Sequence, residues 1–289
     1  MIVVILAGGM GNQMFEYAAA RALALRNNTQ LVLNTTNGFK RDKVYNRVYC
    51  LDVFGVKFIR RKLLSFDFPL GFVFDKLSRK LGRHLFFPWY RYLDEKTTPV
   101  SDLLVPMHNR KVVLTGVWPQ LDTFSDYADI IRQDFTLNIP LPSQVQYYVN
   151  NISNSEIPVI AMGVRIYQEI KDEKIRSQSF FYYDGNYFER ALSYYKEKIG
   201  KFKLLIFTQA KDWVKDNVCL EGIDFEYVNT SKSDADAIYD MYIMSKCHHY
   251  VLSDSSFYFW GCWLNSSANK QVVIPQGWKN CVMEEWIKL

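Results

Sequence analysis

The N-terminal segment contains a strand, a glycine-rich turn, a helix and a second strand, in that order. Ile2–Ala7 is a continuous apolar run that ends in the turn Gly8–Gly11. The helix that follows repeats apolar residues every four positions from Phe15 to Leu23, and Gln30–Leu33 has the composition of a strand. Two strands joined through a helix pair in parallel with a right-handed crossover. The opening of the chain therefore predicts an α/β fold with a parallel sheet.

The alternation of strands and helices restarts after a break in the middle of the chain. Residues 37–105 are expected to be irregular, Ile139–Ser143 is rich in proline, and Asn150–Glu156 is polar, as in a linker region. We predict two Rossmann-like domains, 1–150 and 151–289, that face a cleft, where open α/β sheets place their ligands. The other expected strands are 111–117, 159–164, 203–208, 225–228, 250–253 and 271–274, and the other expected helices are 124–135, 184–199, 212–218, 236–247 and 255–265.

The positive charge of the chain is concentrated in one segment. The formal net charge is +5, from 35 Lys and Arg against 30 Asp and Glu. Nine basic and two acidic residues lie between Lys57 and Arg91, a net +7, so the rest of the chain carries −2. A long basic stripe is absent from the sequence, and we expect no nucleic-acid partner.

Aromatic residues are interleaved with the basic residues of the segment 57–91, among them Phe58, Phe72, Phe86 and Trp89. Apolar faces with basic edges suit an anionic membrane surface. One interpretation is that the segment docks the protein on the inner membrane. The other, at least as well supported, is an ordinary acceptor-domain surface with its rings turned inward.

The hydropathy and cysteine patterns indicate a cytoplasmic chain, peripheral to the membrane at most. The N-terminus has no basic region before its apolar run, and no apolar stretch reaches ~18 residues. The five cysteines include no Cys-x-x-Cys pair, as expected of reduced, mostly buried thiols.

Two short motifs contain residue types that bind metal ions, Cys247–His249 and Asp234–Asp236. In a strand, neighbouring side chains such as His248 and His249 point to opposite faces. Acidic residues at the start of a helix are favoured by its dipole without any ion. We therefore expect no metal site.

The glycine turn has the composition of a phosphate cradle, because glycines let backbone N–H groups approach an anion at a helix N-terminus. Gly9 and Gly11 begin a Gly-x-Gly-x-x-Gly pattern, but Met14 replaces the third glycine. The second strand runs into Asn34–Thr36, without the acidic residue that binds a ribose hydroxyl in NAD sites. NAD is a poor fit, while a ligand cradle and a plain tight turn stay equally open.

Four segments, in the same order, resemble the bacterial alpha-1,2-fucosyltransferase family. Gly8–Ala18 is similar to the family's N-terminal signature, and Asp254–Asn265 resembles its N-S-S-F-S-W-W-G-A-W-L-N segment. The last is the most specific, because a buried strand followed by Ser-Ser-Phe and two tryptophans is rare by chance. The other two are Gly116–Phe135, similar to G-Y-W-Q-S…F…I-R-x-D-F, and Asp240–Cys247, similar to D-L-Y-L-M-S-x-C.

The resemblance implies a GT-B-like fold with an acceptor-side N-terminal domain and a C-terminal domain that binds the nucleotide sugar. It implies an inverting glycosyltransferase that moves fucose from GDP-fucose to a galactoside hydroxyl of a surface glycan. It also implies that the protein needs no metal ion and no other cofactor. The partners are then the nucleotide-sugar donor and the glycan acceptor.

Two family motifs are altered in this chain. H-x-R-R-x-D aligns with Gly163–Gln168, where only Arg165 is kept, and F-S-D-D aligns with 207–210, where both Asp are lost. The resemblance implies that one of these Asp residues accepts hydrogen bonds from the edge of guanine. Gln209 or Ala210 takes its place here; Gln offers a carbonyl acceptor, and Asp212 is an alternative.

The leaving diphosphate gains negative charge during transfer, and without a metal ion arginine, N–H groups and hydroxyls must meet it. Arg165 is the predicted catalytic residue, since its guanidinium forks onto two phosphate oxygens. Ser255 and Ser256 open a helix after a strand, where hydroxyls and N–H groups form an anion site. The predicted donor-binding residues are Gly9, Gly11, Asn12, Gln13, Thr208, Gln209, Asp254, Ser255, Ser256 and Phe257.

The general base for the acceptor hydroxyl stays open, because the family's His is missing. Glu16, Glu169, Asp172 and Glu173 are candidates. Two alternative functions also stay open: transfer from a different nucleotide sugar, and a catalytically weak protein that binds a nucleotide sugar.

Overall fold

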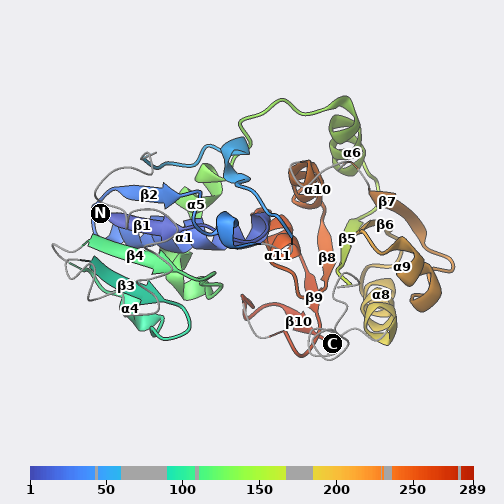
Figure 1. The fold of residues 1–289 in the computed structure, drawn as a ribbon. Coiled ribbons are helices and arrows are strands. Elements are labelled where there is room, and N and C mark those ends of the chain that lie inside the picture. The colour runs from blue at the N-terminus through green and yellow to red at the C-terminus, as the bar shows by residue number, and fades with distance from the viewer. Residues whose placement is uncertain are drawn as a thin grey trace. The chain divides into compact units, whose positions relative to one another are not determined.

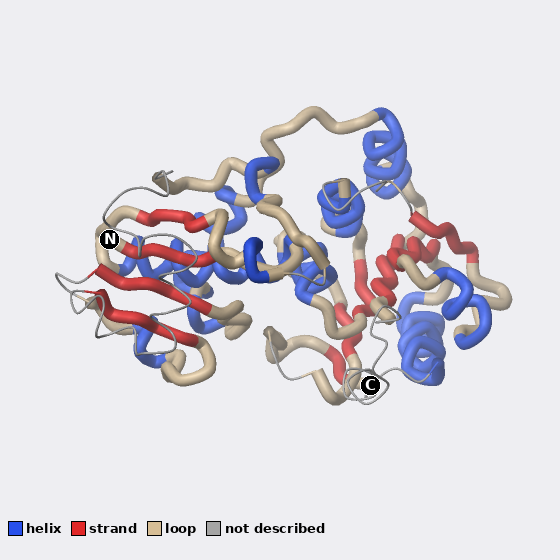
Figure 2. The backbone as a smooth tube through the Cα atoms, in the orientation of Figure 1, coloured by secondary structure: helices blue, strands red, loops and turns tan. Residues whose placement is uncertain are grey.

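The chain divides into two compact units, Met1–Ile139 and Pro140–Leu289. The division lies earlier than the expected boundary at residue 150, because the polar stretch after Pro142 folds as helix α6 (Ser143–Ser153), which packs against helix α10 of the second unit. The computed structural model, drawn in Figures 1 and 2, describes residues 1–42, 45–59, 90–107, 111–166, 185–228, 230, 236–278 and 281–289.

The first unit is built on a four-stranded parallel sheet in the order β2-β1-β4-β3, whose arrows run the same way in Figure 1. Val3 of the central strand β1 is in register with Val32 on one side and Val113 on the other. The strands are β1 (Ile2–Ile5), β2 (Leu31–Asn34), β3 (Tyr90–Asp94) and β4 (Lys111–Thr115); the helices are α1 (Met10–Arg26), α4 (Ser101–Leu104) and α5 (Ala128–Asp134), with 3-10 turns at Phe39–Arg41, Leu51–Val53, Leu121–Thr123 and Ser125–Tyr127.

Helix α1 is buried on almost every side, because its residues are mostly apolar or small. A φ of 72° at Gly8 turns the chain out of β1, and Gly9 takes the N-cap position in extended backbone. The helix packs on β1, β2 and β4. It ends at Asn27, whose Nδ2 donates to the carbonyl of Leu23 at 2.8 Å.

A buried network joins α1 to the end of α5. The carboxylate of Asp134 accepts from Tyr17 Oη and from Arg21 Nε, both at 2.8 Å. Tyr17 Oη in turn accepts from the backbone N–H of Lys57 at 2.8 Å. Two segments that carry the family resemblance therefore hold the first unit together.

The second unit contains a six-stranded parallel sheet in the order β10-β9-β8-β5-β6-β7. Its elements after α6 are β5 (Val159–Val164), α8 (Gly185–Ile199), β6 (Lys203–Thr208), α9 (Lys211–Asn217), β7 (Asp224–Val228), α10 (Ala237–Met244), β8 (His249–Leu252), α11 (Ser256–Trp263), β9 (Val272–Ile274) and β10 (Ile287–Lys288).

Helices cover both faces of this sheet, because its strands are apolar on both sides. On one face, Met162 packs with Tyr187 of α8 and Val214 of α9 in a buried cluster. On the other face, Gly163 lies under the ring of Tyr258 from α11. Both units therefore have the Rossmann-like α/β organisation predicted from sequence.

Most expected elements are confirmed, and β5 and β6 have the predicted bounds. Strand β3 and helix α4 lie inside residues 37–105, which were expected to be irregular, and β10 was not predicted. Helix α5 begins at Ala128, because 3-10 turns occupy the start of the range 124–135.

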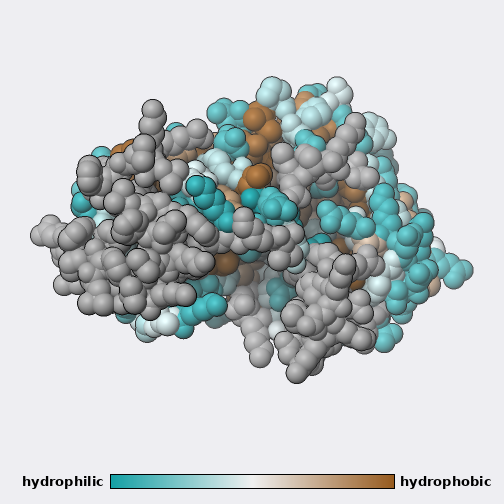
Figure 3. All heavy atoms as spheres, viewed as in Figure 1, coloured by the Kyte–Doolittle hydropathy of each residue, from teal (hydrophilic) through white to brown (hydrophobic). Residues whose placement is uncertain are grey.

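Some large hydrophobic side chains of the described residues are exposed. Tyr147 and Phe225 are among the exposed large hydrophobic side chains, and the described part of the face in Figure 3 is mostly hydrophilic. No helix in the described ranges is long and apolar enough to cross a membrane. No disulfide joins any of the five cysteines, and Cys219 is exposed while the others are buried. Most of the segment 57–91, including Phe72, Phe86 and Trp89, lies outside the described residues, whereas Phe58 is half-buried.

Candidate functional site

Three neighbouring strands of the second unit bring most of the predicted site residues to one edge of its sheet. Strands β8, β5 and β6 are adjacent and parallel, so their carboxyl ends lie together (Figure 1). Asp254 follows β8, Arg165 follows β5, and Gln209 follows β6. In open α/β sheets this edge is where ligands bind.

The backbone of Arg165 is tied to the end of β8. Its N–H donates to Ser253 Oγ at 2.8 Å, and the N–H of Ser253 donates to the carbonyl of Gly163 at 2.9 Å. Ser253 is fully buried, whereas Arg165 is half-buried. The guanidinium of Arg165 therefore extends from a fixed backbone position at the edge of the sheet.

Tyr258 holds the ends of β5 and β6 at the same level. Its hydroxyl donates towards the carbonyls of Phe207, at 2.8 Å, and Val164, at 3.2 Å. A Cβ on Gly163 would lie 2.6 Å from Cγ of this ring, so only glycine fits there. Arg165, which follows β5, and Thr208, the last residue of β6, are thereby positioned relative to α11.

The N-terminus of α11 is capped by a serine. Ser255 is the N-cap residue in extended backbone, but its side chain makes no capping hydrogen bond. Its neighbours Asp254, Ser256 and Phe257 are half-buried. Burial raises the pKa of the Asp254 carboxyl. The Ser255 hydroxyl and the first N–H groups of the helix have the chemistry of an anion site.

The end of β6 offers a ligand fewer acidic hydrogen-bond acceptors than the family motif does, because both Asp residues are lost. Thr208 Oγ1 accepts from the backbone N–H of Ala210 at 3.0 Å, which shapes the turn, and the side chain of Gln209 is exposed. Asp212 is also exposed, with its carboxylate 3.7 Å from Lys215 Nζ.

The predicted donor-binding residues in and after the glycine turn of the first unit differ in their surroundings. A Cβ on Gly9 would meet nothing within 4 Å, so packing does not require glycine at this position. Gln13, by contrast, is fully buried; its Nε2 donates to the carbonyls of Gly8 and Val48, at 2.9 and 2.8 Å, and its Oε1 accepts from Cys50 at 2.9 Å. The side chain of Gln13 holds the chain together, which argues against its predicted role in donor binding. Asn12 is half-buried beside Gly8, and Gly11 is buried.

The carboxyl edge of the first sheet carries the carboxyl groups of Glu16 and Glu95, of which sequence reasoning considered only Glu16. Glu16 is buried and accepts from the N–H of Ala7 at 2.8 Å. Glu95 follows β3 and accepts from the N–H of Val117 at 2.7 Å. Burial raises the pKa of Glu16 well above its usual range, against the Ala7 hydrogen bond, and the charge of Glu95 adds to the effect. The signal for Glu95 was an acidic residue directly after a strand, but β3 itself was not predicted.

The loop that Glu95 supports has unusual backbone. Gly116 has a φ of 103° and Trp118 a φ of 55°, and Trp118 is fully buried with its indole N–H donating to the carbonyl of Thr115 at 3.1 Å. A Cβ on Gly116 would lie 2.4 Å from Cβ of Glu95, so the glycine makes room for this side chain. Non-glycine residues with positive φ are sparse and cluster at functional sites.

The described residues contain no group of three or more His, Cys, Asp and Glu side chains that could hold a metal ion. His248 Nδ1 accepts from the N–H of Val159 at 2.8 Å, and His249 Nδ1 from that of Gln271 at 3.1 Å. Both histidines therefore complete the ends of strands. Most of the Asp234–Asp236 motif lies outside the described ranges, as do Glu169, Asp172 and Glu173.

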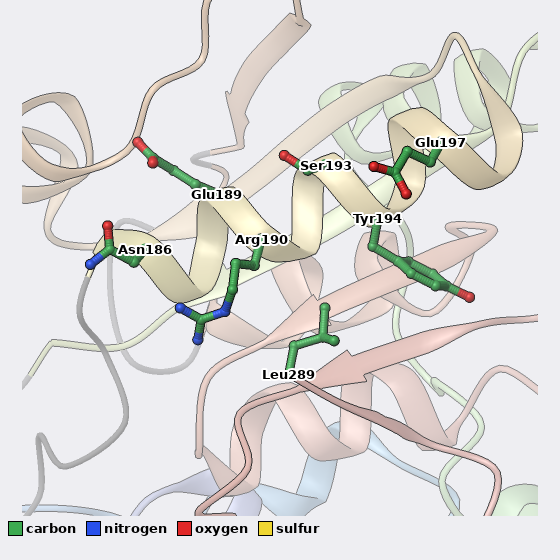
Figure 4. A pocket seen from close by; sticks show the side chains of 7 residues that line it. All are labelled: Asn186, Glu189, Arg190, Ser193, Tyr194, Glu197 and Leu289. Carbon is green, nitrogen blue, oxygen red and sulfur yellow. The ribbon is translucent and has the colours of Figure 1, made fainter.

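A surface hollow lies along one side of α8 (Figure 4). It collects polar side chains and the last residue of the chain, and none of the predicted site residues contributes to it. Its lining residues are Asn186, Glu189, Arg190, Ser193, Tyr194, Glu197 and Leu289.

Comparison with known protein families identifies the family to which the protein belongs. The family described as "Glycosyl transferase family 11" matches residues 85–286, well over half of the chain. The protein belongs to glycosyl transferase family 11. It is a glycosyltransferase of a fucosyltransferase family, which confirms the resemblance seen in the sequence.

Two curated relatives of this family 11 protein come from Escherichia coli. An O-antigen biosynthesis glycosyltransferase, WbnK, is 24% identical over 322 aligned positions, covering 98% of this chain and 99% of the relative. An alpha-1,2-colitosyltransferase is 23% identical over 286 positions, covering 96% of this chain and 92% of the relative.

Solved structures share the fold of the family 11 protein at low identity. Arabidopsis thaliana FUT1, as a mutant in complex with GDP, has a TM-score of 0.56 at 15% identity and covers 96% of this chain and 70% of its own. NodZ alpha-1,6-fucosyltransferase soaked with GDP-fucose has a TM-score of 0.52 at 15% identity, covering 91% and 92%. The predicted GT-B-like fold class is confirmed.

Proposed function

We propose that this family 11 protein is an inverting alpha-1,2-fucosyltransferase that moves fucose from GDP-fucose to a galactoside hydroxyl. The observation that carries the proposal is the arrangement of Arg165 and Ser255 on the adjacent ends of β5 and β8, linked through Ser253. Proteins of the same fold have been crystallised with GDP and GDP-fucose, and a relative is named for an alpha-1,2 linkage.

The chemistry assigns a separate task to each part of this edge. The bond from the anomeric carbon to the diphosphate breaks, and the electron pair leaves with GDP. Arg165 neutralises the growing charge through two parallel N–H donors, and the Ser255 hydroxyl with the N-terminus of α11 meets a further oxygen. Fixed donors of this kind lower the barrier because they need no reorganisation when charge develops. In this account no metal ion takes part.

The expected guanine contact departs from the family motif, because Gln209 and Ala210 stand where the family has acidic residues. An exposed Gln209 carbonyl accepts one hydrogen bond from the guanine edge but carries no charge. A second candidate donor follows from the colitosyltransferase relative: a nucleotide sugar that carries colitose. An alternative function is that of a catalytically weak protein that binds a nucleotide sugar.

A thermal-shift and transfer panel tests these functions together. The protein is incubated with GDP, UDP and ADP, then with GDP-fucose and colitose-bearing nucleotide and galactoside acceptors. Stabilisation by GDP over UDP and ADP, with fucose transferred to the 2-hydroxyl, is expected. A preference for colitose or for another base would replace the donor assignment, and binding without turnover would favour the weakly catalytic alternative.

Peripheral contact with the inner membrane is a separate part of the proposal. It rests on the net charge of +7 between Lys57 and Arg91 and on the aromatic residues among those charges. Flotation with vesicles that contain anionic lipid should carry the protein upward at low salt and not at high salt. Absence of salt-sensitive flotation would leave the segment as an ordinary surface of the acceptor-side unit.

A further inference from the structure

Glu95 lies at the carboxyl edge of the first unit's parallel sheet, the edge at which open α/β sheets bind ligands. It follows β3 directly, and its N–H donates to the carbonyl of Thr115 at the end of β4 at 3.1 Å. The side chain is half-buried, between solvent and the buried edge. Glu95 is thus rigidly based and accessible from outside, as a group that contacts a substrate must be.

One oxygen of the Glu95 carboxylate is fixed by the protein. Oε2 accepts from the N–H of Val117 at 2.7 Å, and Gly116 leaves room for the side chain. Because the carboxylate is planar and rigid, the hydrogen bond to Oε2 also limits the direction in which Oε1 points. This geometry positions a basic oxygen without using up its ability to accept a proton.

The neighbouring carboxyl groups are unsuited to the same task. Glu16 is only 2% exposed, and its Oε2 accepts from the N–H of Ala7. Asp94 accepts from Thr115 Oγ1 at 3.0 Å and from the N–H of Lys96 at 3.1 Å, one bond on each oxygen. Among the described carboxylates of this edge, Glu95 alone is half-buried and accepts a hydrogen bond from the protein on one oxygen only.

We propose that Glu95 is the general base that accepts the proton of the acceptor hydroxyl through Oε1. The proposal rests on the transfer reaction proposed above, for which no general base was assigned, and it assigns that role to Glu95. As the acceptor oxygen bonds to the anomeric carbon, its O–H bond breaks and the proton moves to Glu95. The bond from that carbon to the diphosphate breaks in the same reaction, and its electron pair leaves with the nucleotide.

The test replaces Glu95 and compares transfer with donor binding. Glu95→Gln keeps an oxygen acceptor for the Val117 N–H but removes the base, so kcat for transfer should fall by about 10²- to 10⁴-fold. The Kd for the donor nucleotide should stay within about twofold, since no nucleotide contact is removed. Asp52→Asn, an exposed carboxylate of the same unit, is the matched control and should keep wild-type transfer.

Chemical rescue separates a base from a structural carboxylate. Glu95→Ala should regain transfer when formate is added, in proportion to formate concentration, whereas Glu95→Gln should not. Melting curves show whether each variant is folded. Full transfer by folded Glu95→Gln, absence of formate rescue in folded Glu95→Ala, or loss of transfer in Glu16→Gln with Glu95→Gln active would each overturn the assignment.

The experiment also distinguishes this proposal from that on the donor. Each variant is assayed with whichever nucleotide sugar the wild-type protein uses best. A donor other than GDP-fucose would contradict the donor assignment and leave the Glu95 comparison intact. A wild-type protein that binds nucleotide sugars but transfers none would contradict both.

Discussion

The ring of Tyr258 occupies the space that a side chain on Gly163 would need, with Cγ 2.6 Å from the Cβ position. Tyr258 belongs to α11 and Gly163 to β5, so this contact fits the helix that begins with Ser256 onto the strand that leads to Arg165. The hydroxyl of Tyr258 then reaches the carbonyls that end β5 and β6. The contact therefore fixes the two parts of the candidate anion site, Arg165 and Ser255, relative to each other.

Removing the Tyr258 hydroxyl should loosen the packing of α11 against the ends of β5 and β6. Tyr258→Phe leaves the buried carbonyls of Val164 and Phe207 without their donor, at a cost of about 1–3 kcal/mol in the free energy of unfolding. We expect a lower Tm and weaker nucleotide binding together. Tyr194→Phe, at a half-buried tyrosine of α8, is the matched control and should melt like the wild type. Equal Tm values for all three proteins would show that the two carbonyls do not depend on Tyr258.

Ser255 should matter for ligand binding and not for stability. Since its side chain makes no capping bond, Ser255→Ala should change the free energy of unfolding by no more than about 0.5 kcal/mol. A hydrogen bond to a charged diphosphate contributes about 1.5–3 kcal/mol, so the Kd for nucleotide should rise about 10- to 100-fold. Ser253→Ala is the contrasting variant, because it orphans the N–H of Arg165 and should lower Tm. A destabilised Ser255→Ala with unchanged nucleotide affinity would mean that the serine is only a cap.

Gly9 and Gly8 should respond differently to the same substitution. A Cβ on Gly9 meets nothing within 4 Å and its φ is −75°, so Gly9→Ala should fold with unchanged Tm. Gly8 has a φ of 72°, and Gly8→Ala should cost roughly 1–2 kcal/mol in stability. If a ligand approaches the turn closely, Gly9→Ala loses transfer activity although it is folded. Full activity of Gly9→Ala would make the turn a plain connection.

The buried carboxyl of Glu16 should give stability a distinctive pH dependence. Its pKa in the folded protein is raised, chiefly by burial, above the value of about 4.3 of an unfolded chain. The folded state therefore holds the proton more tightly, and the group's contribution is greatest below about pH 4 and is lost as pH rises through the folded pKa. Glu16→Gln should remove this loss, so that its Tm advantage over the wild type grows from pH 5 to pH 8. Exposed Glu156→Gln is the control, and parallel Tm curves for Glu16→Gln and the wild type would contradict the raised pKa.

Local sequence pattern predicted the second sheet well, for a physical reason. β5 is apolar throughout and β6 is apolar between Lys203 and Thr208, because helices cover both of their faces, and such runs are readily recognised as strands when glycine and polar residues bound them. Strand β3 escaped prediction because its sequence, Tyr-Arg-Tyr-Leu-Asp, is only partly buried and has charged residues at its second and last positions. Glu95 was missed with it, since a residue gains its position at a sheet edge only once the strand is known.

Long-range contacts limited the prediction of the site. Gln13 lies in the family-like segment Gly8–Ala18, but the carbonyl of Val48 and the N–H of Cys50 come from far along the chain and take up its amide. Nothing in the local sequence predicts that pairing. The positions of Arg165 and Ser255, in contrast, were predictable: Arg165 directly follows β5, Ser255 comes shortly after β8, and neighbouring parallel strands place their ends side by side.

Transfer by Arg165→Ala is the measurement that tests the central claim most directly. Arg165→Ala and Arg190→Ala, a matched change on the exposed side of α8, are compared with wild type for nucleotide Kd, kcat of transfer and Tm. The account predicts that Arg165→Ala keeps the wild-type Tm while kcat/KM falls by at least about 10²-fold, as for loss of one fixed donor to a developing charge, and that Arg190→Ala is unaffected. Wild-type transfer by a folded Arg165→Ala protein would contradict it.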